Sequence, residues 1–375
     1  MRLQLALASA FVAVVATTST AVADGSVTAR GVYYKERATR VMQPMLDGVF
    51  EAGSSGLVDL HFLVDAITSA SASAGAANAV AFTENRYEVG VGYAHQLDGL
   101  SIGGLKLGGD AKYSTESDYK SIYGGVRGEL ELAQKNTTLG LGGGVSYDTI
   151  TAGSAGGLSQ PTIECELGEM EQTECNQRTL SVYGAASQIL SRQALVGISV
   201  DIARLDGYQS NPYRSAIAGD ELVAERHPTL RTRQAFAVSA RYYLKRTDTA
   251  LIGAYRYYRD SWKVHAHTPE LRVIQQISDV ADASVRYRYH NQDGAFFFRE
   301  RYASADEMFV TDDVKLSTMT THTMEAKLGI TGATFDLKGR WAAARFEGIL
   351  QYVVQYNRFG NAIIAHIGLT VPLSY

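Results

Sequence analysis

Residues 363–375 read IIAHIGLTVPLSY, and this stretch decides the fold class. Every second residue, from Ile363 to Tyr375, is apolar or aromatic, whereas the intervening positions are mostly small or polar. Successive side chains of a β-strand point to opposite faces of a sheet, so a period of two predicts a strand with one apolar face. Pro372 lacks the N–H that a central ladder needs, and we therefore expect it at the rim of the sheet.

The same alternation recurs along most of the chain. In residues 122–132, IYGGVRGELEL, one parity holds Ile122 and Val126 and the other holds Arg127 and Glu129. Similar patterns occupy residues 58–66, 139–148, 233–244, 251–258, 282–289 and 345–356. A charge that faces lipid at mid-depth costs about 2–4 kcal/mol, so charges confined to one parity favour a wall with lipid on its other side. A soluble β-sandwich would alternate in the same way and stays open at this point.

The N-terminal residues 1–23 are typical of a cleavable signal peptide. Arg2 precedes an apolar run from Leu3 to Ala16, and Ala21-Val22-Ala23 fits the small-x-small cleavage pattern. The run is shorter than the roughly 20 apolar residues of a spanning helix, which weighs against the alternative of a membrane anchor. Cleavage would remove one charged residue, Arg2, and make the formal net charge of −4 one unit more negative.

The signal peptide and the C-terminal aromatic residue together favour a membrane barrel over a sandwich. The chain end is similar to the assembly signal of bacterial outer-membrane barrels, carried here by Ile367, Leu369, Val371, Leu373 and Tyr375. Tyr residues near segment ends fit the aromatic girdles of such barrels. We therefore predict an all-β fold, a single transmembrane antiparallel up-and-down barrel over residues 24–375, in the outer membrane of a Gram-negative bacterium. The expected partners are outer-membrane lipids and, during biogenesis, the barrel assembly machinery.

About 16 strands are expected, with 14 to 18 allowed by soft boundaries. They are predicted at residues 28–35, 42–52, 57–67, 86–97, 104–113, 119–132, 137–149, 178–190, 194–204, 230–244, 249–260, 268–277, 281–290, 316–330, 344–356 and 363–375. Short turns are expected at residues 53–56, 98–99, 134–136, 191–193, 245–248 and 278–279, and longer connections at 68–85, 150–177, 205–229 and 291–315. Short turns at one end and long loops at the other are typical of outer-membrane barrels.

The amino-acid composition excludes several other classes of protein. A charged fraction of 20% with 22 Tyr and 12 Phe argues against disorder, and the near-neutral balance argues against nucleic-acid binding. Two cysteines are too few for a disulfide-stapled scaffold or a four-cysteine zinc site. We expect Cys165 and Cys175 to form a disulfide in an oxidising compartment, with a free reactive pair as the alternative. The Glu residues beside them could take a divalent cation or simply form a solvated acidic loop.

The lumen is the part of the barrel that could carry function. Inward acidic residues are expected from the N-terminal third, and inward basic residues from the tenth to thirteenth strands. The acidic set is Asp47, Glu51, Asp59, Asp65, Glu88, Glu129 and Glu131, and the basic set is Arg231, Arg233, Arg241, Arg256, Arg272, Arg286 and Arg288. On opposite walls these sets would create a transverse field that orients polar solutes. The alternative is that the charges pair across the lumen, or with Glu270, Asp282, Glu325 and Glu347, and close it.

Catalytic and metal-binding motifs are weak in this sequence. His265 and His267 form an H-x-H pair, with His290 expected on the next hairpin, but there is no clear third ligand, and interface or loop histidines are the simpler interpretation. Asp59, His61 and Asp65 lack a motif that supplies a nucleophile or oxyanion donors. The glycine runs 103–104 and 142–144 have no phosphate-loop context and indicate strand positions where neighbours pack closely or the wall bends. We expect no enzyme, no cofactor and no metal.

Several stretches together resemble an uncharacterised family of Gram-negative outer-membrane barrels that is known as a domain of unknown function. The stretches are VDAITSAS at 64–71, NPYR at 211–214, ERHP at 225–228, RTRQ at 231–234, YRYYRDSW at 255–262 and HTPELR at 267–272. Where the family usually has a proline after the first of these, the chain has the Ala-rich residues 73–81. The resemblance implies the barrel and its location, and no activity.

These observations predict a porin-like channel for passive diffusion of small polar solutes. A non-conducting barrel that acts as a structural or docking partner for other envelope proteins is the first alternative, and a barrel enzyme is the second. Oligomeric state is left open by the sequence.

Overall fold

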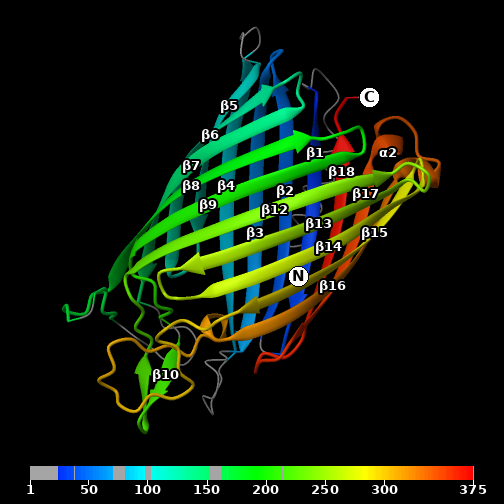
Figure 1. Cartoon of the computed structure of the whole chain (residues 1–375). Helices are drawn as coiled ribbons and strands as arrows, with labels where there is room; N and C mark the ends of the chain where they lie inside the picture. Colours follow the sequence, from blue (N-terminus) through cyan, green and yellow to red (C-terminus); the bar gives the residue numbers. More distant parts are fainter. Residues whose placement is uncertain are drawn as a thin grey trace.

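The computed structural model describes residues 24–37, 39–70, 81–97, 103–152, 162–166, 168–212 and 214–374. Sixteen antiparallel strands form one closed barrel, and β1 pairs with β18 to close it (Figure 1). The barrel strands are β1 Gly25–Lys35, β2 Thr39–Ala52, β3 Gly56–Ala70, β4 Ala81–Leu97, β5 Gly104–Thr115, β6 Tyr119–Leu132, β7 Thr137–Thr151, β8 Glu174–Ile189, β9 Ala194–Gly207, β12 Leu230–Leu244, β13 Thr249–Asp260, β14 His265–Ser278, β15 Ala281–Gln292, β16 Met319–Thr331, β17 Arg345–Gln355 and β18 Ala362–Pro372. The predicted fold class and strand number are confirmed.

The closing seam shows why the C-terminal alternation was decisive. Val371 lies opposite Val27 and Ile367 lies opposite Gly31, so the apolar parity of β18 continues the apolar parity of β1. Pro372 is the last residue of β18, where its missing N–H interrupts no further ladder. Near that end Val371 is fully buried beside Ala344, which precedes β17, so the outward face of the last strand is partly covered by the chain itself.

The outer surface of the barrel is apolar. Val126 is 71% exposed, Leu141 65% and Ile367 72%, as expected for side chains that face hydrocarbon. Arg127, the next residue after Val126, instead forms ion pairs with Asp110 of the neighbouring strand β5 and with Asp59 of β3. Because apolar residues alternate with charged ones around a closed barrel, the protein is an outer-membrane barrel with a polar interior. No helix among the described residues is both long enough and apolar enough to span a membrane.

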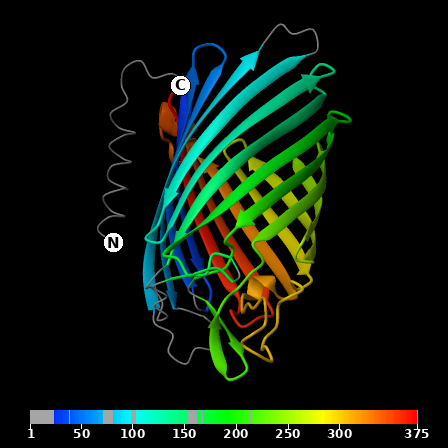
Figure 2. The same cartoon turned by 90° about the vertical axis from the view of Figure 1, so that its left-hand side faces the viewer.

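The two ends of the barrel differ in their connections (Figure 2). Residues 53–55, 133–136, 190–193, 245–248 and 279–280 are short turns at one end, which we call the short-turn end. The connection from β16 to β17 is longer there and contains the short helices η3 Gly332–Phe335 and α2 Arg340–Ala343. The predicted turn at 98–99, the whole of the predicted signal peptide (residues 1–23) and Tyr375 lie outside the described residues. The signal peptide therefore stays a prediction.

The opposite end, the long-loop end, is more structured than the sequence suggested. The connection from β9 to β12 contains a hairpin of β10 Ser215–Ala218 and β11 Glu221–Ala224. The connection from β15 to β16, residues 293–318, is called the cover loop here. The predicted connection was 291–315, and the cover loop extends beyond it to residue 318. Residues 316–318 therefore belong to the loop and not to the predicted strand, because the short helix η2 Val314–Leu316 ends there and β16 begins at Met319.

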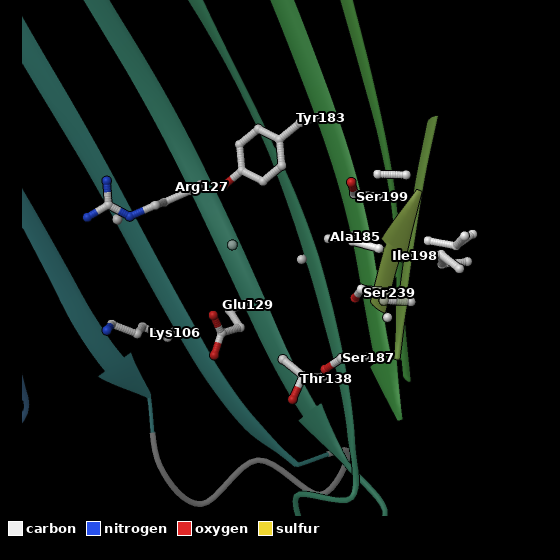
Figure 3. Close-up of a pocket in the computed structure, with 18 of the residues that line it drawn as sticks. Lys106, Arg127, Glu129, Thr138, Tyr183, Ala185, Ser187, Ile198, Ser199 and Ser239 are labelled. Atoms are coloured by element: carbon white, nitrogen blue, oxygen red, sulfur yellow. The ribbon is translucent and has the colours of Figure 1, made fainter. Parts of the chain in front are cut away.

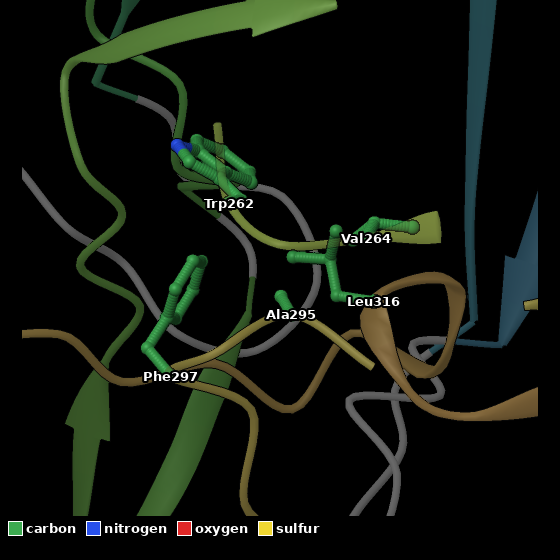
Figure 4. Packing of buried hydrophobic residues seen from close by; sticks show 5 residues of the cluster. All are labelled: Trp262, Val264, Ala295, Phe297 and Leu316. Atoms are coloured by element: carbon green, nitrogen blue, oxygen red, sulfur yellow. The ribbon is translucent and has the colours of Figure 1, made fainter. Parts of the chain in front are cut away.

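The cover loop has its own apolar contacts. Ala295, Phe297 and Leu316 pack on Trp262 and Val264 of the β13–β14 turn (Figure 4). Further along, Tyr302 and Val310 pack against Ala216 and Ala218 of the hairpin, and backbone bridges join Ala218 to Tyr302 and Arg226 to Val310. These contacts hold the cover loop against its neighbours at the barrel mouth, because each buries apolar side chains that would otherwise face water.

Candidate functional site

One part of the inner wall is an ion-paired network on β14, β15 and β16. Arg288 Nε donates to Glu270 Oε2 at 2.8 Å, and Arg286 Nη1 lies 3.3 Å from the same oxygen. Arg286 also pairs with Glu325, and Arg272 lies 3.7 Å from Glu270 and 3.8 Å from Glu325. Three of the predicted pore-lining arginines therefore share two glutamates within the wall.

The network continues around the barrel on both sides of the closing seam. Lys327 and Arg345 both pair with Glu347, at 2.6 and 2.9 Å, and Arg345 also pairs with Asp282. Most of the predicted acidic residues of the N-terminal third have partners as well, from adjacent strands or turns except for Asp59 on β3, whose partner lies on β6. Asp47 pairs with Arg30 and His61, Asp59 with Arg127, Asp65 with Arg86, Glu88 with Lys112 and His61, and Glu131 with Lys135. We call this arc, from β14 through β18 and β1 to β6, the charged wall.

A minority of the predicted pore-lining residues make no ion pair with any described residue. The basic ones are Arg233, Arg241 and Arg256, and the acidic ones are Glu51 and Glu129. Arg231 pairs with Asp260, so four of the seven predicted basic residues and five of the seven acidic ones have a counter-ion. Most of these pairs join adjacent strands, and the others join strands two or three places apart in the barrel order. The uncompensated charge that could act on a solute is thus smaller than the sequence suggested.

The other part of the inner wall, from β7 to β13, is lined by small residues and is called the small-residue wall. It borders a hollow of about 470 Å³, whose lining includes Gly140, Ala185, Gly197, Ser199, Ala237, Ser239 and Ala254. Figure 3 shows Lys106, Arg127 and Glu129 on one side of this hollow and Ser187, Ser199 and Ser239 on the other. Water and small polar solutes can occupy such a space because its walls combine hydroxyls, charges and little bulk.

Glycines make room for two aromatic rings on this wall. A Cβ at Gly142 would lie 2.4 Å from the Tyr183 ring, and one at Gly125 or Gly144 would lie 2.3 or 2.5 Å from the Tyr123 hydroxyl. The rings therefore rest against bare backbone instead of extending into the lumen. Of the two interpretations of the glycine run 142–144, close packing of neighbours or a bend in the wall, the contacts of Gly142 and Gly144 bear out close packing.

A second cavity lies at the long-loop end, between the barrel wall and the cover loop. Its volume is about 440 Å³, and we call it the vestibule. The barrel contributes Gln177, Thr179, Ala203, Leu205, Arg231 and Arg233, and the loops contribute Gln209, His227, Trp262, Asp313 and Leu316. The vestibule combines two guanidinium groups with an aromatic ring and several amide or hydroxyl groups.

Buried polar groups dock the cover loop beside the vestibule. Glu225 Oε1 accepts hydrogen bonds from the Thr311 hydroxyl at 2.7 Å and the Asp312 N–H at 2.9 Å. Arg214 pairs with Asp313 at 2.5 Å, and Arg358 of the β17–β18 connection pairs with Asp312 at 2.7 Å. The cover loop is therefore tied to both the β9–β12 and the β17–β18 connections.

Burial changes the ionisation of this docking cluster. It raises the pKa of Glu225 to about 7 and lowers the pKa of His227 to about 4. Burial alone would also raise the pKa of Asp313, but the charge of Arg214 and the Lys315 N–H hold that pKa below its ordinary value. His227 is therefore neutral at pH 7, with Nδ1–H donating to the Gln209 carbonyl at 3.0 Å.

Two further predictions concern the cysteine pair and the C-terminal residues. Cys165 and Cys175 form the predicted disulfide, and Cys175 packs with Ile150, Ile163 and Tyr208. Ile367, Leu369, Val371 and Leu373 end the barrel, and their recognition during assembly stays a prediction.

The histidines expected as metal-ligand candidates are not brought together. His267 contacts the outward Tyr255 hydroxyl at 2.5 Å, whereas His290 contacts Thr268 at 2.9 Å and is half-buried within the barrel. Among the described residues, one group brings three potential metal-ligand oxygens within 4.8 Å of one another, and it was missed from sequence: Glu84, Glu116 and Asp118. His61 lies 2.6 Å from Asp47, and Asp65 pairs with Arg86 instead of His61.

Sequence reasoning also missed the docking cluster around Glu225. The only signal was the ERHP stretch at 225–228, which carried the family resemblance but no interpretation. Its partners Thr311 and Asp312 are more than eighty residues away in the chain, so no local pattern could connect them.

Comparisons with known proteins support the fold and identify a family model. The model described as "Protein of unknown function (DUF3570)" matches residues 81–352. No curated protein matches the sequence. A bacterial polysaccharide outer-membrane secretin is similar at 6% identity and a TM-score of 0.51, covering 92% of this chain and 97% of that chain.

Two outer-membrane proteins of Pseudomonas aeruginosa are also similar over almost their whole length. OccK3 (OpdO) has 9% identity and a TM-score of 0.45, with 93% of this chain and 95% of that chain covered. OpdK has 10% identity and a TM-score of 0.45, with 94% and 99% covered. At these identities the comparisons concern the fold alone.

Proposed function

Because this chain belongs to the DUF3570 family of proteins of unknown function, we propose a function from its own barrel: a porin-like channel for passive diffusion of small polar solutes. The carrying observation is the hollow of about 470 Å³ beside the small-residue wall. Barrels of about 16 strands enclose more space than side chains fill. Here the small residues of β7 to β13 leave that space open on one side of the lumen.

The solute would pass through a reduced transverse field. Arg241 on β12 and Glu51 on β2 make no ion pair with any described residue, and their strands lie eight positions apart around the sixteen-strand barrel. They therefore come from opposite walls. Together with Arg233, Arg256 and Glu129, they are the members of the two predicted sets without a counter-ion, and they would contribute to ion selectivity because paired charges largely cancel at a distance.

Planar-bilayer recording tests the channel. Purified protein should give discrete conductance steps, and their absence at every voltage would overturn the proposal. Replacing Arg241 and Arg256 with Glu should move the reversal potential in a KCl gradient toward cation preference. Arg204→Glu is the matched control because Arg204 belongs to the outward parity of β9 and reverses the same charge outside the lumen. An equal shift of the reversal potential in the control would mean that Arg241 and Arg256 do not line the pore.

A non-conducting docking barrel is the second candidate. The cover loop favours it, because its packing on Trp262 and its bridges to the hairpin give the long-loop end a defined surface. Protein that inserts into bilayers, resists proteolysis as a folded barrel and still passes no current would support this function over the channel.

A further inference from the structure

We infer that the vestibule is a binding site for the carboxylate of a singly charged organic solute, held by Arg233. This inference deepens the proposed function and rests on it, because the vestibule lies at the long-loop end, where external solutes would enter. The argument depends on the contrast between Arg233 and its neighbour Arg231, which belong to the same face of β12.

Arg231 is fully occupied by protein groups. Its Nε donates to Asp260 Oδ2 at 2.8 Å, and its guanidinium lies over the Trp262 ring at 4.0 Å. Only 10% of its side chain is exposed. Arg231 is therefore a structural residue that holds Trp262 and Asp260 in place.

Asp260 cannot serve Arg233 as well, although it lies directly opposite Arg233 in the register of β12 and β13. Besides Arg231, the Asp260 carboxylate accepts hydrogen bonds from the Trp262 N–H at 2.9 Å, the Val264 N–H at 3.0 Å and the Tyr258 hydroxyl at 2.8 Å. Its side chain is completely buried. These donors saturate the oxygens of Asp260.

Arg233 is left without an acceptor. Among the described residues, none accepts a hydrogen bond from its guanidinium or lies within ion-pair distance, and its buried Nε has no partner. The side chain nevertheless lines the vestibule. A partly desolvated cation without acceptors is unfavourable, so an anion that supplies them gains more binding free energy here than at the surface.

The remaining vestibule groups limit the ligand to one negative charge. Asp313 is compensated by Arg214, and His227 is neutral at pH 7, so Arg233 is the one uncompensated cation among the described lining residues. A guanidinium fork binds a carboxylate through two parallel hydrogen bonds. A dianion would bring a second charge close to Asp313. The Thr179 hydroxyl, which bonds no other described residue, and the Gln177 side chain offer contacts for the polar body of the solute.

The site has a built-in reporter, because Trp262 lines the vestibule and Trp341 is the only other tryptophan in the sequence. In a Trp341→Phe background, the emission of Trp262 is titrated with sodium gluconate, with sorbitol as its uncharged analogue and sulfate as a dianion. We expect a saturable change with gluconate, and at least tenfold weaker effects with sorbitol and sulfate. Equal responses to all three probes would overturn the inference.

Variants locate the effect. Arg233→Gln should weaken gluconate binding at least tenfold, and Arg233→Lys should retain part of it because it keeps the charge without the fork. Arg204→Gln is the matched control, since it removes an arginine from the outward parity of the adjacent strand β9. Unchanged affinity in Arg233→Gln, or equal losses in both glutamine variants, would contradict the site.

The titration separates this inference from the channel itself. Gluconate binding in detergent micelles needs no conduction, so binding without current would refute the channel and keep the site. Conductance steps with no gluconate response would keep the channel and refute the site. If Arg233→Gln fails to fold, as shown by loss of heat-modifiable migration of the barrel, the Arg233→Lys variant and the three-probe comparison still decide the outcome.

Discussion

The charged wall and the small-residue wall show the same alternation of inward and outward residues, but they differ in the side chains that face the lumen. On the charged wall, large polar side chains fill their side of the lumen and satisfy one another, as Arg286 does between Glu270 and Glu325. On the small-residue wall, residues such as Gly140 and Ser199 have few polar side-chain atoms that need partners and little bulk, so they leave a hollow. The difference teaches that inward parity alone does not make a residue pore-lining in a functional sense. What matters is whether its polar groups are already used.

The largest expected effect is on stability, at the charged wall. Arg286→Met removes a guanidinium whose side chain is only 9% exposed and leaves Glu325, 6% exposed, without its closest partner. Loss of one member of a buried pair costs about 3–5 kcal/mol. We expect roughly 3 kcal/mol, the lower end of that range, because Arg272 stays 3.7 and 3.8 Å from the two glutamates. Urea unfolding in lipid vesicles measures the change.

Arg241→Met is the control for this experiment. It makes the same substitution at an inward arginine without an ion pair, and surface-like substitutions of this kind usually change stability by less than about 0.5 kcal/mol. Similar losses in both variants would mean that the two walls do not differ in the way described.

A smaller effect is expected at the glycine that supports Tyr183. In Gly142→Ala the new Cβ would lie 2.4 Å from the ring, so the ring must move off the wall. Overpacking costs about 1–3 kcal/mol, and we expect the low end because the tip of the ring is free to move. Single-channel conductance should fall as the ring enters the hollow. In a Tyr183→Ala background, Gly142→Ala should change neither the stability nor the single-channel conductance. If it still does, the effect comes from the backbone at residue 142 and not from the displaced ring.

The smallest effect concerns pH, outside the membrane-spanning strands. Glu225 has a pKa of about 7 when buried against an ordinary 4.5, so lowering the pH from about 8 to 5 favours the docked cover loop. His227 has a pKa of about 4 when buried against an ordinary 6.5, so the same change disfavours docking below about pH 7. The two contributions oppose each other, and docking in the wild type should depend only weakly on pH.

Single substitutions expose each contribution. In His227→Gln only Glu225 still titrates. Hydrogen exchange of residues 293–318, corrected for the intrinsic pH dependence of exchange, should therefore slow as the pH is lowered from 8 to 5. In Glu225→Gln only His227 still titrates, and the corrected exchange should become faster over the same pH range. Two variants with the same direction of change would refute the assignment of these groups to the docking equilibrium.

Much of the barrel was predictable because its rule is local. Alternation assigns Val126 to the lipid and Arg127 to the lumen from two adjacent letters, and the disulfide between Cys165 and Cys175 needed only the compartment. Parity does not say which residues become neighbours, however. The position of Arg286 between Glu270 and Glu325 depends on the register of three strands. The cover loop was missed as a packed unit because loop contacts follow no period.

The seam between the first and last strands has a consequence for biogenesis. Ten residues of β1 find their partners in β18, and almost the whole described chain separates the two strands. Until β18 is present, β1 and β17 would each expose a row of unpaired backbone amides and carbonyls, the kind of edge that recruits stray strands. We therefore expect that loss of β18 yields aggregates instead of a narrower barrel.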